Sequence, residues 1–302
     1  VQTCALPIFI SLLKHVMLHA TQISTDGMAE YYLNNKPLSD FGIVPSRSNK
    51  HIALSGCFDL PKRIGDTYFD WPRENGIDPY VDESDIQFDS RSIRFTGYII
   101  GNLELNVRSL QNYVLALPEL SMLSCKWGSW NVKVNKSIDI TPIDKNNARI
   151  SISFVEPIPD LSGTLPPIST IKDIDDYSWK SLGLYIEKIN GSFNIKPLKS
   201  LDVTQNPDRT IRSTGGEDKG KVTISAHVVA TSFEDFKSRI KSLYRLFGSA
   251  GLRTINYRGR SIYCFAINGF TITNVIMKDI IVAKFTCELI ETSKIIHANE
   301  DI

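Results

Sequence analysis

The chain has 302 residues, which is enough for one large domain or for two domains of about 150 residues each. Its 34 Lys and Arg residues nearly balance its 33 Asp and Glu residues, and the net charge of +1 argues against a polybasic nucleic-acid-binding protein. The five cysteines are widely spaced and form no C-x-x-C motif, which argues against a disulfide framework or a zinc site. No apolar run reaches the roughly 18 residues that a membrane span needs.

Residues 1–27 differ in character from the sequence that follows. Residues 5–18 are apolar enough to resemble a signal-peptide core, but Lys14 and His15 interrupt them and no positive charge precedes them. Residues 5–8 resemble a translated sequencing-adapter fragment, and Met28 stands immediately before a strand-like run, as a natural start would. We therefore expect residues 1–27 to be a non-native or disordered leader. The alternatives are a secretion signal and a genuine helix.

The most unusual segment is an acidic loop predicted at residues 66–89. It contains eight acidic residues and a single base, Arg73, with aromatic residues interleaved. A loop of this length without its own core is uncommon unless it is functional or docked, and aromatic residues with an acidic rim are typical of an interface. We therefore predict that it contacts an adjacent subunit, through Asp70, Trp71, Asp78, Tyr80, Asp82, Glu83 and Asp85.

Other interpretations of the acidic loop stay open on the sequence alone. Paired carboxylates beside aromatic residues occur in glycosidase clefts, where one carboxyl group has a raised pKa and the other is ionised. Asp82, Glu83 and Asp85 could chelate calcium, although the EF-hand pattern and its central glycine are absent. The simplest alternative is a solvated loop. If the interface prediction is right, deleting residues 70–85 should leave the monomer folded yet weaken assembly.

A strand and a helix are predicted after the acidic loop. Residues 95–100 are strand-like and lead into a helix from Asn102 to Leu117, which Pro118 ends. The apolar residues of this helix recur at intervals of four and three, which places them on one face: Leu103, Val107, Leu110, Val114 and Leu117. An alternating strand at residues 148–156 closes this half of the chain.

A proline-rich segment separates the two halves. Residues 157–176 contain four prolines and no periodic pattern, so we predict an extended connector. This places the first domain at residues 28–156, the linker at 157–178, the second domain at 179–292 and a tail at 293–302.

The second half repeats the pattern of the first. Strand-like residues 224–230 lead into a helix predicted from Ser232 to Phe247, with Ser232 and Asp235 as a capping box and Gly248 as the C′ residue. Its apolar face matches that of the first helix after a shift of 130 residues, and residues 148–156 match 283–291 in character. We therefore predict an internal duplication. Each copy should be an α+β unit, a mainly antiparallel β-sandwich or barrel with one flanking helix.

Patterns typical of catalysis or ligand binding are scarce. His51, His227 and His297 have no His or Cys neighbour at metal-ligand spacing, and we expect His227 to be an ordinary sheet residue. Cys57 lacks an identifiable His partner for nucleophilic catalysis. The glycine-rich residues 215–220 precede a strand and lack the spacing of a phosphate loop, which favours a hairpin or a mobile loop. We predict no enzymatic activity, no cofactor and no metal site.

Three segments of the first half resemble phage distal tail proteins, the siphophage-type tail component family. They are residues 32–43 (YLNNKPLSDFGI), 54–65 (LSGCFDLPKRIG) and 91–97 (RSIRFTG). The resemblance covers residues 28–156 and reaches the second half only through the internal repeat. None of its motifs is catalytic.

This resemblance implies a tail-tube-like fold in each unit and a non-enzymatic structural role at the distal end of a virion tail, after assembly in the host cytoplasm. The implied partners are other copies of the chain, in a ring of three or six around the DNA-ejection channel, and neighbouring tail-tube, tape-measure or tail-tip proteins. The second half repeats the first unit, whereas many family members carry a different module there. In this respect the chain is similar to baseplate hub proteins, which carry tandem tube-like domains. The alternative class is a cell-surface or carbohydrate-binding β protein that uses the acidic loop as its ligand site.

Overall fold

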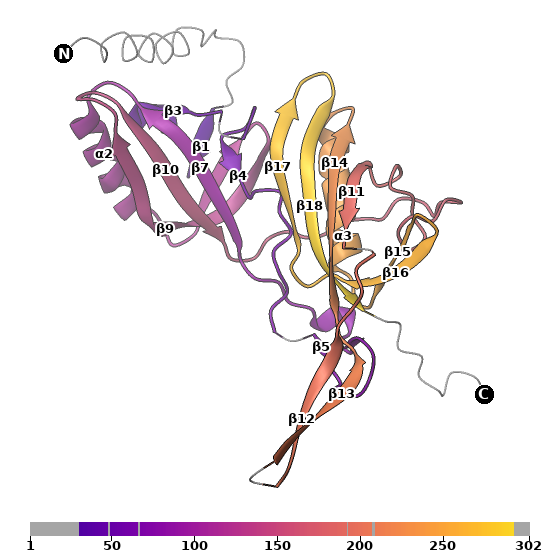
Figure 1. The fold of residues 1–302 in the computed structure, drawn as a ribbon. Coiled ribbons are helices and arrows are strands. Elements are labelled where there is room, and N and C mark those ends of the chain that lie inside the picture. Colours follow the sequence, from indigo (N-terminus) through magenta and orange to yellow (C-terminus); the bar gives the residue numbers. More distant parts are fainter. Residues whose placement is uncertain (1–29, 48, 66, 192, 207–208, 293–302) are drawn as a thin grey trace, which may run out of the picture.

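The computed structural model describes residues 30–292 except residues 48, 66, 192, 207 and 208. The predicted leader at residues 1–27 and the predicted tail at 293–302 lie outside this part of the chain. Two β-sheets, each with one helix, stand side by side and make two units (Figure 1). All the strand pairs of these two sheets are antiparallel, which confirms the predicted α+β class with two units.

The first unit is a sheet with strand order β2-β1-β8-β9-β10-β7-β3, and β4 also pairs with β7. Its long strands alternate buried and exposed side chains, so that one face of the sheet forms the core. The elements of this unit are β1 (Tyr31–Leu33), β2 (Lys36–Pro37), the 3-10 helix η1 (Leu38–Phe41), β3 (Ile43–Pro45), β4 (Leu54–Ser55), β7 (Arg91–Ile99), α2 (Leu103–Leu115), β8 (Ser121–Cys125), β9 (Gly128–Pro142) and β10 (Ala148–Glu156).

The second unit is a sheet with strand order β11-β14-β18-β16-β15, and β17 also pairs with β18. Strand β18 alternates from Ile281 to Glu291, with every second side chain buried, and its last residue, Thr292, is buried as well. The elements of this unit are β11 (Leu184–Asn190), β14 (Gly220–Ala230), α3 (Phe233–Gly248), β15 (Arg253–Tyr257), β16 (Arg260–Phe265), β17 (Phe270–Met277) and β18 (Ile281–Thr292).

Two smaller ribbons lie outside these sheets. The acidic loop contains the short pair β5 (Tyr68–Phe69) and β6 (Asp78–Pro79), followed by the 3-10 helix η2 (Glu83–Asp85). A longer hairpin of β12 (Leu198–Asn206) and β13 (Arg209–Glu217), which we call the arm, projects away from both units (Figure 1). At the base of the arm lies the acidic loop, so the two ribbons are neighbours in space.

The two units have equivalent connectivity. In each, a strand leads into the helix, a hairpin follows, and a closing strand pairs with the first: β7–α2–β8–β9–β10 in one unit and β14–α3–β15–β16/β17–β18 in the other. The likeness also includes a turn that the sequence analysis did not find. Gly42 and Gly183 both have left-handed backbones, with φ of 65° and 72°, just before an edge strand. Their carbonyls accept hydrogen bonds from Ile100 (2.9 Å) and Val229 (3.0 Å) at equivalent places.

Both predicted helices form, and each has a side-chain cap at its N-terminus, of which the sequence analysis predicted only Ser232. The Asn102 side chain accepts a hydrogen bond from the backbone of Leu105 (3.2 Å), and the Ser232 hydroxyl accepts one from Asp235 (3.1 Å). Phe236, Ile240 and Leu243 are buried, as the periodicity of the second helix predicts. The first helix is less deeply packed, because Leu110 is the only buried residue of α2. The other residues of its predicted apolar face are half-buried, whereas Leu105 and Leu115 are exposed.

Gly248 does not act as the predicted C′ residue. It is the last residue of α3, its φ lies outside the left-handed region, and the cap is Ser249 with φ of −75°. A Cβ on Gly248 would lie 3.2 Å from the ring of Phe88. The glycine therefore permits a close approach by the end of the acidic loop, which sequence spacing alone could not reveal.

The predicted connector is extended but packed. The carbonyl of Thr164 accepts a hydrogen bond from Ser242 of α3 (2.7 Å), and Asp160 pairs with Lys241 one residue earlier (3.0 Å). Further along, Ile174 forms an antiparallel bridge with Ile255, so the end of the connector adds to the edge strand β15. The connector thus belongs to the packed surface of the second unit.

Candidate functional site

The two units are joined by residues 49–63 of the first unit, which we call the docking segment. It lies along the outer edge of β17 in the second unit. Leu60 and Phe270 exchange two backbone hydrogen bonds (3.0 and 3.1 Å). The carboxylate of Asp59 accepts from the backbone of Ile272 (2.7 Å), and the imidazole of His51 accepts from that of Met277 (2.9 Å). The joint therefore resembles the addition of a strand to a sheet edge.

Arg63 closes this joint at the end of α3. Its buried guanidinium donates to the carbonyls of Ser249 (2.7 Å) and Phe247 (3.4 Å) and stands 4.9 Å from the ring centre of Phe265. These carbonyls end a helix, where a cation is favoured by the helix dipole. Burial lowers the pKa of Arg63 to about 10, with a further contribution from the charge of Arg253.

A buried ion pair lies behind the docking segment. Arg91 and Glu156 approach to 3.3 Å, and both side chains are buried. Arg91 also donates to the carbonyl of Cys57 (3.0 Å), which accepts a second bond from the indole of Trp130 (3.2 Å). The guanidinium lies 5.3 Å from the ring centre of Tyr244 on α3, so the cluster includes residues of both units. A pair of this kind is costly to break by removing one partner.

The carboxyl groups of Asp59 and Glu156 at the joint have raised pKa values, which favour their neutral forms. Burial raises the pKa of Asp59 to about 6, although its hydrogen bond from Ile272 and the charge of Arg91 act the other way. Burial also raises the pKa of Glu156, against the effect of Arg91. Burial raises the pKa of the Cys57 thiol well above its usual value, which makes it a poor nucleophile. In all three groups the raised pKa follows from burial in the joint.

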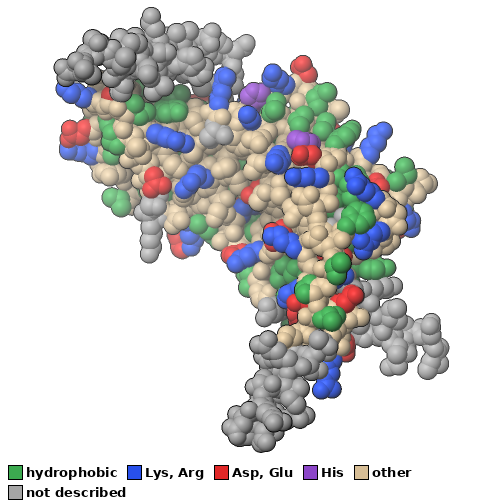
Figure 2. Space-filling view, viewed as in Figure 1, with side chains coloured by type: hydrophobic (Ala, Val, Ile, Leu, Met, Phe, Trp, Pro, Cys, Tyr) green, Lys and Arg blue, Asp and Glu red, His purple; other side chains and the backbone are tan. Residues whose placement is uncertain are grey.

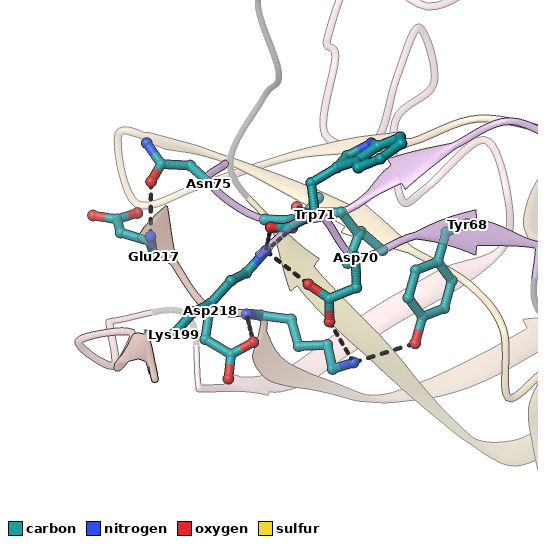
Figure 3. Close-up of polar contacts among 11 residues, drawn as sticks. Tyr68, Asp70, Trp71, Asn75, Lys199, Glu217 and Asp218 are labelled. Carbon is teal, nitrogen blue, oxygen red and sulfur yellow. Dashed lines mark hydrogen bonds and ion pairs between the residues drawn. The ribbon is translucent and has the colours of Figure 1, made fainter. Parts of the chain in front are cut away.

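The acidic loop docks on the base of the arm through Asp70 (Figure 3). Its carboxylate pairs with the ammonium groups of Lys199 (2.7 Å) and Lys219 (3.0 Å). The buried Lys199 also donates to the carbonyls of Trp71 and Gly76, each at 2.8 Å. Burial alone would raise the pKa of Asp70, but the hydrogen bonds and charges of the two lysines outweigh it and lower the pKa.

Backbone contacts hold the tip of the loop against the second unit. Gly76 donates to the carbonyl of Glu217 (2.9 Å), and the side chain of Asn75 accepts from the backbone of Glu217 (2.7 Å; Figure 3). Ile77 is completely buried, and its backbone donates to the hydroxyl of Thr292 (2.7 Å). The loop is therefore a brace between the first unit, the arm and the second unit.

The seven predicted interface residues divide into two groups. Asp70 and Glu83 make contacts within the chain, Asp70 with the two lysines and Glu83 with Arg245 on α3. The second group contains the other five residues, and all seven are half-buried or exposed: Trp71, Asp78, Tyr80, Asp82 and Asp85, together with Asp70 and Glu83. The sequence analysis missed Lys199, Lys219 and Arg245, which lie in the second half of the chain and carry no local signal of this contact.

Three aromatic side chains form an exposed cluster on the loop. The rings of Phe69 and Tyr80 are stacked with centres 4.2 Å apart, and that of Trp71 lies 5.1 Å from Phe69. Their exposed fractions are 46%, 49% and 44% respectively. Asp78 lies opposite Phe69 in the β5–β6 pair. Exposed aromatic residues with acidic neighbours can bind a partner.

The described residues contain no cluster of side chains that could bind a metal ion. No group of three or more His, Cys, Asp or Glu side chains there is placed to hold a metal ion, and this includes Asp82, Glu83 and Asp85. The side chain of His227 lies in β14 and is about half exposed, 4.0 Å from the carboxylate of Glu187.

Acidic and basic side chains are interspersed over the face shown in Figure 2. None of the described helices is both long and apolar enough to cross a membrane.

Comparisons with known proteins match the chain to solved structures. No protein-family model matches the chain, and no curated protein matches it. Among solved structures, the chain is similar to the Dit protein (gp 19.1) of SPP1, described as a paradigm of the hub adsorption apparatus in phages that infect Gram-positive bacteria. The identity is 11%, the match covers 89% of this chain and 100% of that one, and the TM-score is 0.29. With values this low, function has to be argued from the chain's own contacts.

Proposed function

We propose that the chain is a non-enzymatic structural component of a phage tail tip or baseplate, and that several copies form part of a ring around the DNA-ejection channel. The observation that carries this proposal is the joint between the units. One β unit attaches to an equivalent unit through backbone hydrogen bonds at a sheet edge, between Leu60 and Phe270 and from His51 to the carbonyl of Val275. Contacts of this kind, repeated head to tail between copies, close into a ring when the rotation permits.

The equivalence of the two units further supports an internal duplication. The shared order of strands, the helices that begin at Leu103 and Phe233, and the left-handed Gly42 and Gly183 all occur at matching places. The resemblance of residues 28–156 to distal tail proteins is a separate argument, since it rests on sequence. Six chains using their first units, or three chains placing both units in one ring, satisfy a sixfold channel.

The oligomeric state tests this function directly. Analytical ultracentrifugation of the chain started at Met28, at tens of micromolar, should show a single closed species of three or six copies, and micrographs should show a ring. The proposal fails if the chain stays monomeric at these concentrations and also forms no ring with neighbouring tail proteins.

The second candidate function is carbohydrate binding by the acidic loop. The exposed cluster of Phe69, Trp71 and Tyr80 favours it, because aromatic faces with nearby carboxylates can bind sugars. A glycan screen separates the two candidates. Carbohydrate binding is supported if the chain does not assemble but binds a glycan, and if Trp71→Ala abolishes that binding. Assembly without glycan binding supports the ring.

A further inference from the structure

The outer edge of β17 is saturated with hydrogen bonds by the docking segment. Backbone amides at alternate positions of this strand have acceptors there: Phe270 bonds to Leu60, Ile272 to Asp59, and Asn274 to the side chain of Asn49. The side chains facing the core at this edge are deeply buried, with Phe270 at 2% and Ile272 at 1% exposure. The second unit is thus closed along this edge by residues of the first unit.

The equivalent edge of the first unit lies on the second half of β9. The strand registers identify the matching positions: Ile138 and Ile140 pair with Ile152 and Ile150 of β10, as Phe270 and Ile272 pair with Cys287 and Phe285 of β18. On its other side β9 pairs with β8 only over residues 128–132. Among the described strands, none pairs with the outer edge of residues 138–142.

This open edge also leaves apolar surface partly uncovered. Ile138 and Ile140 are only half-buried, in contrast to their counterparts in β17. The flanking helix does not compensate, because α2 buries one residue where α3 buries seven. An unpaired strand edge with a half-covered apolar face is a template for pairing with another chain.

The arm is the counterpart of the docking segment in chain order. The docking segment lies between β3 and β7, and the arm lies between β11 and β14, which are the equivalent strands of the second unit. Beyond its base, the arm has only its own two strands as a sheet. A two-stranded hairpin alone is marginally stable. Its nine-residue strands are about 30 Å long, and the acidic loop fixes their base through Lys199 and Glu217.

We propose that the arm of one copy docks on the open edge of β9 at residues 138–142 of a second copy, in the way that the docking segment closes β17 within the chain. This inference rests on the proposed ring and names its contact. The contact is heterologous, because a projecting hairpin on one copy meets a sheet edge on the next. Copies joined in this way have one free arm and one free edge at the two ends until the ring closes.

Two variants separate the arm from the edge. In the first, Leu201 and Ser213, which pair across the hairpin, are joined by Asn-Gly in place of residues 202–212, which keeps the register and the braced base. In the second, Ile140→Lys places an inward charge on the edge strand, a device that blocks pairing between edges. Ile143→Lys is the matched control, because Ile143 is already exposed in the turn beyond the strand.

Sedimentation of the three variants and the full chain started at Met28 gives the decisive result. The arm-shortened and Ile140→Lys chains should each be monomeric where the full chain and Ile143→Lys assemble. Mixed in equal amounts, they should form a one-to-one complex and nothing larger, because only one arm and one edge remain. If both variants assemble like the full chain, the inference is wrong while the proposed ring stands. A full chain that stays monomeric overturns both.

Hydrogen exchange of the unaltered chain covers the case in which a variant does not fold. Thermal unfolding first shows whether each variant keeps its midpoint within a few degrees. Whatever that outcome, the backbone amides of Ile138 and Ile140, the positions that match Phe270 and Ile272, should exchange at least tenfold more slowly in the full chain at assembling concentration than in dilute solution. Equal exchange rates in the two conditions would overturn the proposal.

Discussion

Arg63→Met tests whether the joint holds the two units together as one folded body. The substitution removes the hydrogen bond to the carbonyl of Ser249 at 2.7 Å, while the longer contact to Phe247 at 3.4 Å contributes little. A hydrogen bond made by a charged group contributes about 1.5–3 kcal/mol. Methionine keeps an apolar side chain beside the ring of Phe265. We therefore expect a loss of about 1.5–3 kcal/mol in the free energy of unfolding.

Urea denaturation followed by tryptophan fluorescence measures this loss, since both units contain tryptophan. Lys62→Met is the matched control, because the neighbouring Lys62 side chain is 65% exposed and its pair with Asp89 is long at 3.9 Å. A surface change of this kind should alter stability by less than about 0.5 kcal/mol. If Arg63→Met behaves like the control, the joint does not stabilise the fold and the argument from it fails.

Three further perturbations report on the core, the joint and the brace. Ile240→Ala should cost about 2–5 kcal/mol of unfolding free energy in urea, whereas Leu105→Ala on the exposed face of α2 should cost little. Asp59 has a pKa raised from 3.8 to about 6, so the stability from its neutral form is present below pH 4 and lost as pH rises through 6. The Asp59→Asn side chain cannot ionise, so the unfolding free energy of this variant should rise relative to that of the unaltered chain by up to about 3 kcal/mol between pH 4 and pH 7.5. This figure is a ceiling, because the side chain is partly exposed. If the difference in unfolding free energy between the two chains is the same at both pH values, this prediction is wrong. Asp70→Asn loses two ion pairs, so trypsin should cut at Arg73 several-fold faster, and an unchanged rate would show that the brace does not depend on this carboxylate.

The helices and long strands were predictable because their signals are local. A helix shows its buried face every three or four residues and a strand every second one, so Ile240 in α3 and Ile150 in β10 are buried as their spacing predicts. The start of the second copy also had a usable signal. Phe41-Gly42-Ile43 and Leu182-Gly183-Leu184 share an apolar–Gly–apolar pattern before an edge strand.

The contacts of the acidic loop were not predictable, because they join residues distant in sequence. Asp70 pairs with Lys199 and Lys219, which lie well over 100 residues further along the chain. Neither lysine differs from any surface lysine in its local pattern. The prediction that deleting residues 70–85 leaves the monomer folded also needs revision on physical grounds. That deletion would remove Ile77, which is completely buried, and leave Lys199 without its carboxylate.

The charge of the loop is consistent with a role inside the chain as well as outside it. Eight acidic residues and one base give the loop a strongly negative charge in a chain whose net charge is +1. Self-repulsion would extend such a segment into solvent unless cations met it. Lys199 and Lys219 at the base of the arm and Arg245 on α3 provide those cations from the second unit. Lys199 lies at the start of the arm and Lys219 shortly after its last residue. The contacts that neutralise the loop therefore also hold the base of the arm, and a ring built through the arm would depend on them.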